Sequence, residues 1–265
     1  MKIDIIDKTG KKVADYDLKL SSDIREDIFK KAVMAESSLF RQPYGASVSA
    51  GRRHSINVSK RRQTFRTTYG KGVSRTPRKT MWRRGMQVRF VGAFSPNTVG
   101  GRRAHPPKAC KIIQKNINNK EWLKALQIGL LASVNKSIVL KNGQRVPEKY
   151  PFILNDDVET IDRTKDFRAF LNSIGFESEI ERLSKKVVRA GKGTMRNRTY
   201  KQKRGPLVVV SSYDSPLLKS SKNIQGFEVI TPDLLMVRDF AMSSKAGRAV
   251  LFTQKAIKEF EEGLK

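Results

Sequence analysis

The chain has 265 residues, of which 38% are hydrophobic, and a formal net charge of +29. No apolar run approaches the roughly 18 residues that a membrane span requires, the acid-bearing N-terminus gives no sign of a secretion signal, and the single cysteine excludes an intrachain disulfide. A positive charge of this size would oppose a compact state unless a polyanion neutralised it.

The first elements predicted along the chain are a strand pair and a helix. Residues 2–6 predict a strand, and residues 11–18 continue it as the second arm of a hairpin. A helix is predicted over residues 24–39, with Asp23 and Glu26 as its N-cap and capping pair. Its apolar stripe consists of Ile24, Ile28, Ala32, Ala35 and Leu39.

Regular patterns resume at residue 120. Residues 120–135 predict a largely buried helix, in which we assign Trp122 to the core rather than to a binding surface. The elements predicted after it are a strand at 151–155, helices at 164–174 and 177–190 that end at Gly175 and Gly191, strands at 207–212, 227–232 and 249–254, and a closing helix at 255–262. Helices that alternate with short apolar strands predict an α/β fold with a mostly parallel sheet and helices on both faces.

The positive charge is confined to two segments without acidic residues. Residues 37–120 hold 20 Lys and Arg and no Asp or Glu, and residues 182–213 hold 10 and none. The remaining 149 residues carry 24 basic and 25 acidic side chains. The chain is therefore a near-neutral α/β domain with two strongly cationic segments, and this pattern indicates a nucleic-acid partner.

The longer segment combines its charge with spaced aromatic residues. It has few residues that build a core, so it cannot offset the entropy of ordering its own backbone. Aromatic rings and guanidinium planes stack on nucleobases, so the pattern favours a loop that RNA orders over a flexible tether. The rings belong to Tyr44, Phe65, Tyr69, Trp82, Phe90 and Phe94.

No catalytic or metal-binding pattern in the sequence is comparably strong. "GKGT" at 191–194 lacks the strand-to-helix context of a phosphate-binding loop, and two histidines with one cysteine cannot form a Cys/His metal cluster. Asp156 and Asp157 have the character of turn and cap residues. We therefore expect no catalytic residue, no metal and no cofactor. The alternative hypothesis is an RNA-processing or nucleotide-using enzyme, which would need a phosphate loop or an acid cluster at the strand ends.

Two long stretches resemble a known family. "GKGVSRTPRKTMWRRGMQVRFVGAFSPNTVGGRRAHPPK" at 70–108 closely resembles the internal loop of the universal large-subunit ribosomal protein four family, in its archaeal and eukaryotic form. "GKGTMRNRTYKQKRGPLVVV" at 191–210 resembles that family's second basic stretch. The resemblance covers essentially the whole chain, and the lack of a long basic C-terminal extension makes it more similar to the archaeal members.

The resemblance implies a fold and a set of partners. It implies a Rossmann-like, three-layer α/β domain, formed by residues 1–40 and 109–265, which binds rRNA on the outside of the large ribosomal subunit. Residues 41–108 would form an extended loop that penetrates the large-subunit rRNA and reaches the peptide exit tunnel, close to the nascent peptide. Neighbouring large-subunit proteins are further expected partners, and the expected location is the cytoplasmic ribosome, with no membrane.

The expected contact residues fall into two sets. The tip of the loop near the tunnel would consist of Arg66, Tyr69, Gly70, Lys71, Gly72, Val73, Ser74 and Arg75. The residues expected to bind rRNA are Arg52, Arg53, Lys60, Arg61, Arg62, Arg78, Lys79, Trp82, Arg83, Arg84, Arg89, Arg102, Arg103, His105, Lys108, Lys192, Arg196, Arg198, Lys201, Lys203 and Arg204. Beside Arg102 and Arg103, the small residues Gly100 and Gly101 are expected to let the backbone approach RNA closely.

Overall fold

A computed structural model of the chain describes every residue except 1, 20–22, 57–60, 64–66, 86 and 265. The chain divides into two compact units. Residues 1–40 and 114–265 form the first, which we call the main unit, and residues 41–113 form the second, the inserted unit. Each unit is described by itself below.

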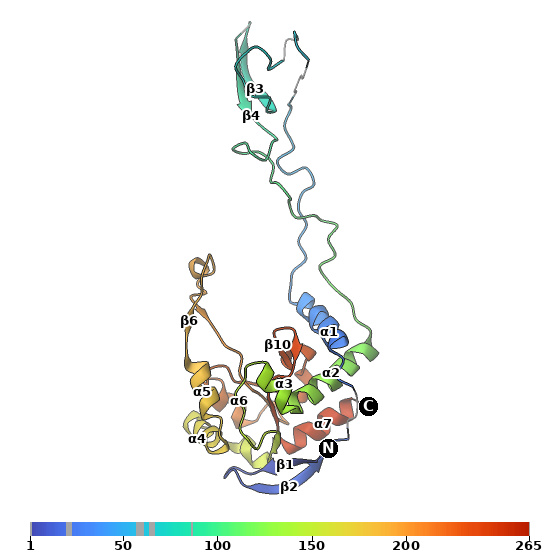
Figure 1. The fold of residues 1–265 in the computed structure, drawn as a ribbon, viewed down its shortest axis with the longest axis vertical. Helices are drawn as coiled ribbons and strands as arrows, with labels where there is room; N and C mark the ends of the chain where they lie inside the picture. Colours follow the sequence, from blue (N-terminus) through green and yellow to red (C-terminus); the bar gives the residue numbers. More distant parts are fainter. Residues whose placement is uncertain (1, 20–22, 57–60, 64–66, 86, 265) are drawn as a thin grey trace. The chain divides into compact units, whose positions relative to one another are not determined.

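The strands of the main unit form two three-stranded sheets (Figure 1). In the first, β1 (Lys2–Ile6) lies between antiparallel β2 (Lys12–Asp17) and parallel β5 (Phe152–Leu154). In the second, β8 (Leu207–Val209) lies between β12 (Val250–Phe252) and β9 (Glu228–Ile230), and all three strands run parallel. An isolated parallel bridge between Leu154 and Thr253 connects the two sheets.

Three of these strands, β5, β8 and β12, are buried on both faces. On β8, Leu207 and Val209 belong to one hydrophobic cluster, whereas Val208 belongs to the other. The same alternation holds for Ile153 against Phe152 on β5. Because successive side chains of a strand point to opposite faces, the two clusters lie on opposite sides of the sheets.

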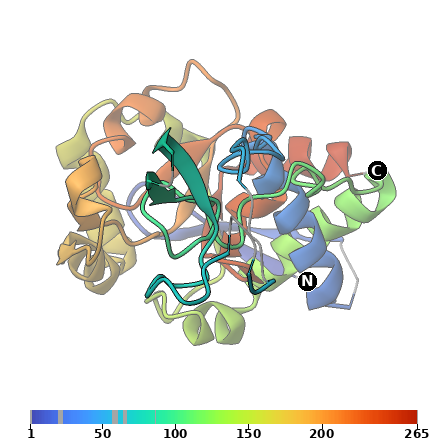
Figure 2. The same cartoon turned by 90° about the horizontal axis from the view of Figure 1, so that it is seen from above.

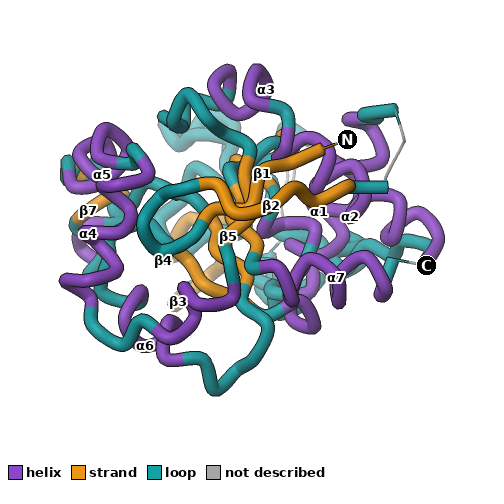
Figure 3. The backbone as a smooth tube through the Cα atoms, turned by 90° about the horizontal axis from the view of Figure 1, so that it is seen from below, coloured by secondary structure: helices purple, strands orange, loops and turns teal. Residues whose placement is uncertain are grey.

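Two groups of helices supply the outer sides of these clusters. On one side of the strands lie α1 (Glu26–Leu39), α2 (Asn119–Val134) and α7 (Gln254–Gly263), and on the other lie α4 (Thr164–Ile174), α5 (Glu177–Ser184) and α6 (Pro216–Ser221), as Figure 3 shows from below. The remaining elements of the main unit are short: α3 (Lys136–Lys141), η1 (Asp156–Thr160), β6 (Val187–Val188), η2 (Thr194–Arg196), β7 (Tyr200–Lys201), η3 (Pro232–Leu234), η4 (Val237–Asp239), β10 (Ala241–Met242) and β11 (Lys245–Ala246). Within the described residues, no helix combines the length and hydropathy of a bilayer span.

The expected fold class is confirmed in part. The sequence analysis correctly predicted mixed α/β content and core strands that are buried on both faces. It also correctly predicted parallel strands, which form the β12–β8–β9 sheet. The structure does not contain one continuous parallel sheet, because β1 and β5 belong to a separate sheet with the antiparallel β2.

The first helix is shifted from its predicted position. It begins at Glu26, and the residue before it is Arg25, whose side chain pairs with Asp27 instead of capping the backbone. The prediction of Asp23 as the N-cap is therefore wrong. Ala32 and Ala35 of the predicted stripe are buried, together with Phe29, whereas the two ends of that stripe, Ile24 and Leu39, are exposed.

The helix predicted over residues 177–190 is too long. It ends at Ser184, and the exposed Val187 and Val188 form β6, which pairs antiparallel with β7. Two adjacent β-branched residues favour extended backbone, and this local preference ends the helix before Gly191.

The inserted unit contains a hairpin that the sequence analysis missed. β3 (Arg78–Arg84) pairs antiparallel with β4 (Gln87–Gly92), as Figures 1 and 2 show. Gly85 adopts a φ of +56° at its turn, a conformation that glycine adopts without strain. The Ala93 amide donates to the Pro77 carbonyl at 2.9 Å and closes the open end of the hairpin.

Candidate nucleic-acid interface

The inserted unit has no internal means of neutralising its charge. Its 73 residues contain 18 Lys and Arg and no Asp or Glu. Carboxylates are the groups with which buried and surface cations of a protein ordinarily pair. The unit therefore presents a dense positive potential to any anion that approaches it.

Six of the predicted rRNA-binding residues lie on the β3–β4 hairpin. They are Arg78, Lys79, Trp82, Arg83, Arg84 and Arg89. Trp82 is opposite Arg89 in the register of the two strands, and its side chain is 50% exposed. A half-exposed indole beside a guanidinium offers a nucleobase both a stacking face and a charge.

The predicted tip is organised around one aromatic ring. The guanidinium groups of Arg75 and Arg62 lie 4.4 and 5.5 Å from the centroid of Tyr69. Gly70 and Gly72 both adopt positive φ, +72° and +63°. These contacts join Tyr69 and Arg75 of the predicted tip to Arg62, and Arg66 lies outside the described residues.

The backbone meets itself within the inserted unit, at residues 51 and 102. A Cβ atom on Gly51 would come within 2.6 Å of the Arg102 Cα atom, so glycine is required where the two backbones meet. The structure thereby gathers the dipeptides Arg52–Arg53 and Arg102–Arg103, which are 50 residues apart in the sequence. The Arg102 guanidinium also lies 5.8 Å from the centroid of Phe94.

The glycine at 101 also has a role in the fold of the inserted unit. A Cβ there would lie 2.0 Å from the Ser95 carbonyl oxygen, so Gly101 allows the turn at 95–101 to close on itself. Gly100, at φ +73°, faces open space. The other predicted contacts of this unit, Arg61, His105 and Lys108, are exposed, and Lys60 lies outside the described residues.

The second basic stretch forms a hairpin that projects from the main unit (Figure 1). Its strands are β6 and β7, and the Arg189 amide continues their ladder by donating to the Thr199 carbonyl at 2.8 Å. A single 3-10 turn, η2, forms the tip, with Lys192, Arg196 and Arg198 exposed around it. "GKGT" thus lies in a hairpin tip and does not open a helix, which is incompatible with a phosphate-binding loop.

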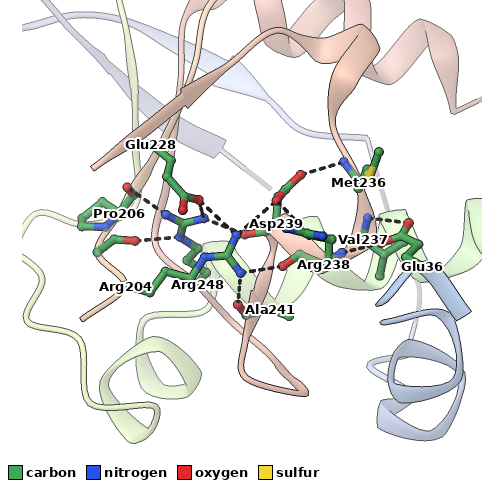
Figure 4. A network of polar contacts seen from close by, with 11 residues as sticks. Glu36, Arg204, Pro206, Glu228, Met236, Val237, Arg238, Asp239, Ala241 and Arg248 are labelled. Carbon is green, nitrogen blue, oxygen red and sulfur yellow. Dashed lines mark hydrogen bonds and ion pairs between the residues drawn. The ribbon is translucent and has the colours of Figure 1, made fainter. Parts of the chain in front are cut away.

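Two predicted contacts at the base of this hairpin are engaged inside the protein. The Lys203 ammonium donates to the Arg182 carbonyl at 2.8 Å. Arg204 donates to the carbonyls of Arg238 and Ala241 and pairs with Glu228 and Asp239 at 3.0 and 3.1 Å (Figure 4). The partly exposed Arg204 thus also stabilises the fold of the main unit, and its contact with rRNA stays a prediction. Lys201 is exposed.

Arg204 is part of a polar network that the sequence analysis missed. The fully buried Arg248 donates to the Gly205 carbonyl at 2.6 Å and pairs with Glu228 at 2.6 Å. Burial lowers the pKa of Arg248 to about 10, and the nearby charge of Arg204 adds to this effect. Burial raises the pKa of Glu228, but the charges of Arg248 and Arg204 outweigh it, so that this pKa lies below its usual value. The sequence around Arg248, "AGRAV" at 246–250, gives no local sign that this arginine is buried.

A second network joins the two ends of the main unit where the insertion leaves and returns. The buried Glu36 carboxylate, near the end of α1, accepts from the Trp122 indole at 2.6 Å and from the amides of Val237 and Arg238 at 3.0 and 2.8 Å. The Lys115 amide donates to the Ser38 hydroxyl at 2.9 Å. Trp122 also packs against the core, as expected. We call Glu36, Ser38, Lys115 and Trp122 the root clamp.

The chain was compared with known proteins. The family model of the ribosomal protein L4/L1 family matches residues 17–263. A large ribosomal subunit protein uL4 from Nanoarchaeum equitans is 37% identical over 239 residues, which cover 90% of this chain and 89% of the relative. The uL4 protein of Methanospirillum hungatei is 34% identical over 262 residues and covers 98% of both chains. That of Saccharolobus solfataricus is 31% identical over 268 residues, or 99% of this chain and 95% of the relative.

These matches confirm the resemblance drawn from the two basic stretches. All three relatives are archaeal, in agreement with the expected archaeal type. The match spans both units, because the family model begins in β2 and ends at the last residue of α7. The chain belongs to the ribosomal protein L4/L1 family.

Proposed function

We propose that the protein is a structural constituent of the large ribosomal subunit and binds large-subunit rRNA through both units. The observation that carries this proposal is the inserted unit, in which 18 cations and exposed aromatic rings occur without one carboxylate. RNA supplies the missing anions, and its bases supply partners for the rings. Family membership and the names of the relatives, all proteins of the large ribosomal subunit, support the same role.

We further propose that residues 41–108 run into the rRNA and that their tip lies beside the peptide exit tunnel, near the nascent peptide. The gathering of arginines around Tyr69 supports this role for the tip. Neighbouring large-subunit proteins are the other partners, and cytoplasmic ribosomes are the location. Residues 1–40 and 109–265 then form the domain at the subunit surface. The bridge from Leu154 to Thr253 supports treating its two sheets as one Rossmann-like, three-layer arrangement.

The enzyme hypothesis has no support in the geometry of the strand ends. In α/β enzymes, ligands bind outside the carboxyl ends of the parallel strands. Here the Glu159 carboxylate occupies that position: it accepts from the amide of Ser211 at 2.8 Å and from the Thr253 hydroxyl at 2.6 Å. The neighbouring Asp156 accepts from the Lys255 amide at the start of α7. Both acids thus hold the fold together, and Asp156 is a cap residue as the sequence predicted.

Co-sedimentation with purified large ribosomal subunits tests the proposal. We expect the protein to sediment with the subunits at low salt and to be released at high salt, because each phosphate contact releases counterions. Changing Lys192, Arg196 and Arg198 to Gln should lower the slope of log affinity against log salt by about 0.7 to 0.9 for each phosphate that is no longer neutralised. Lys258→Gln, on the exposed side of α7, is the control. A protein that stays in the supernatant at low salt would refute the proposal.

A further inference from the structure

Two hollows in the main unit lie on either side of one short segment. The larger, of about 700 Å³, lies between the base of the β6–β7 hairpin and residues 222–228. The smaller, of about 500 Å³, is lined by residues of α4 and α5. Residues 223–225 line both hollows, and we call the two hollows together with this segment the 223–225 groove.

The groove is strongly cationic. Exposed lysine and arginine side chains line it on both sides, namely Lys185, Lys186, Lys201 and Lys222 in the larger hollow and Lys165 and Arg168 in the smaller. None of these six is in an ion pair with a described residue. Among the described lining residues Glu228 is the single acid, and Arg204 and Arg248 neutralise it. The groove thus offers several unneutralised charges to an anion.

One exposed aromatic ring lines the larger hollow, and a charge lies beside it. The Tyr200 side chain on β7 is 51% exposed, and the Lys186 ammonium lies 5.7 Å from the centroid of its ring. A nucleotide needs a flat face for its base and a cation for its phosphate, and these two residues provide both. Three carboxamides that line the same hollow can donate to and accept from a base edge: Gln202, Asn223 and Gln225.

We propose that the 223–225 groove binds single-stranded RNA and takes one unstacked nucleotide into its larger hollow. The inference rests on the function proposed above and adds to it a specific site on the main unit. A hollow of about 700 Å³ is within the range of sites that enclose a small organic ligand. An acidic polypeptide would use the same lysines, but it has no need of an exposed ring, so the ring and the carboxamides favour RNA.

Photo-cross-linking with the full-length protein tests the groove directly. The probe is a single-stranded RNA of about ten nucleotides that contains 4-thiouridine, at a concentration below saturation. We expect cross-links in the tryptic peptide 223–238. Tyr200→Leu should lower their yield about 5- to 150-fold, because one base-to-ring stack is lost. Tyr213→Leu is the matched control: Tyr213 is 75% exposed in the same unit and does not line the groove.

The contrary outcomes are distinct from one another. If Tyr200→Leu and Tyr213→Leu give the same yield at 223–238, or if cross-links occur only within residues 41–113, the groove is not an RNA site. A third contrary outcome would come from polyglutamate as a competitor. If polyglutamate displaces no RNA from the wild-type protein, but binds the protein less tightly after Lys186→Gln and Lys222→Gln, the groove binds an acidic protein. That result would overturn the proposal. In each of these cases co-sedimentation with large subunits would persist, whereas failure of the proposed function would abolish it.

Discussion

Arg248 has the largest side chain that is fully buried in the described part of the chain. It contacts the turn before β8, the acid on β9 and the Asp239 carbonyl in η4, so one guanidinium fixes three segments (Figure 4). A buried charge is tolerated only when it is paired and hydrogen-bonded. The stability of this region therefore depends on Glu228, which alone pairs Arg248 with a carboxylate among the described residues.

The pH dependence of Glu228 gives a first prediction. Its pKa in the folded state lies below the ordinary 4.5, so its contribution to stability is present above that value and is lost as the pH falls through the folded-state pKa. Glu228→Gln should lower the free energy of unfolding at pH 7 by about 1–3 kcal/mol. Between neutral and acid pH, the Glu228→Gln variant should also lose less of its free energy of unfolding than the wild-type protein does. Urea titrations over this range provide the measurement.

A control for this prediction lies on α1. Glu26 pairs with Lys30 on the exposed side of the helix, and the hydrogen bond and charge of Lys30 lower the pKa of Glu26 as well. Solvent screens such a pair, so Glu26→Gln should change the acid limb of the profile much less. If both variants change the pH dependence of the free energy of unfolding equally, the Arg248 network does not determine stability at acid pH.

The root clamp gives a second prediction at this scale. Trp122→Phe keeps the ring in the core but removes the indole donor to Glu36. Because a hydrogen bond to a buried carboxylate is lost, we expect about 1.5–3 kcal/mol less stability in chemical denaturation. The chain has one other tryptophan, the exposed Trp82 of the inserted unit, and Trp82→Phe should change stability by less than about 0.5 kcal/mol. Similar losses in both variants would contradict the clamp.

At the residue scale, the sequence identified the basic stretches but did not show which arginines are exposed and which form ion pairs inside the protein. Arg198 and Arg204 stand in the same basic stretch, yet one is exposed at the hairpin tip and the other joins Glu228 and Asp239. The partners of Arg204 lie 24 and 35 residues further along the chain. Such contacts depend on tertiary packing, and no local pattern encodes them.

At the scale of elements, the end of α4 gives a third prediction. Gly175 terminates the helix with a φ of +97°. Gly175→Ala should therefore cost about 1–2 kcal/mol, because an L side chain is strained in that conformation. Gly263, the exposed last residue of α7, has no positive φ, and a Cβ there would meet open space, so Gly263→Ala should leave stability unchanged or raise it by up to about 1 kcal/mol. Thermal unfolding of both variants checks the difference, and a destabilising Gly263→Ala would contradict it.

The elements that the sequence predicted correctly share a strong periodic pattern. α4, from Thr164 to Ile174, and the core strands β8 and β12 carry apolar residues at the spacing that their structures require. The hairpins β3–β4 and β6–β7 lack that signal, because their strands are exposed on most faces and have no core to pack against. Alternation of bulky residues at Trp82, Val88 and Phe90 was a weak sign of the first hairpin.

At the scale of the molecule, the root clamp predicts that the main unit folds without the insertion. All four residues of the root clamp belong to the main unit. Their hydrogen bonds, from Trp122 to Glu36 and from Lys115 to Ser38, therefore form without residues 46–107. A chain that lacks those residues should be soluble and should unfold cooperatively on heating. Adding Trp122→Phe should destabilise the shortened chain as much as the full chain. A shortened chain without cooperative unfolding would show that the two units depend on each other.

The carboxylate-free composition of the inserted unit has a consequence for magnesium. Hard divalent cations prefer oxygen ligands, and the acidic side chains of a protein are strong competitors for them. A segment that runs through folded rRNA and carries acids would draw Mg²⁺ away from the phosphates that the ion holds together. The inserted unit cannot do so, because it contains neither Asp nor Glu. Its arginines and lysines instead neutralise phosphates themselves and release cations from them, so RNA that folds around this unit should need less magnesium for charge neutralisation.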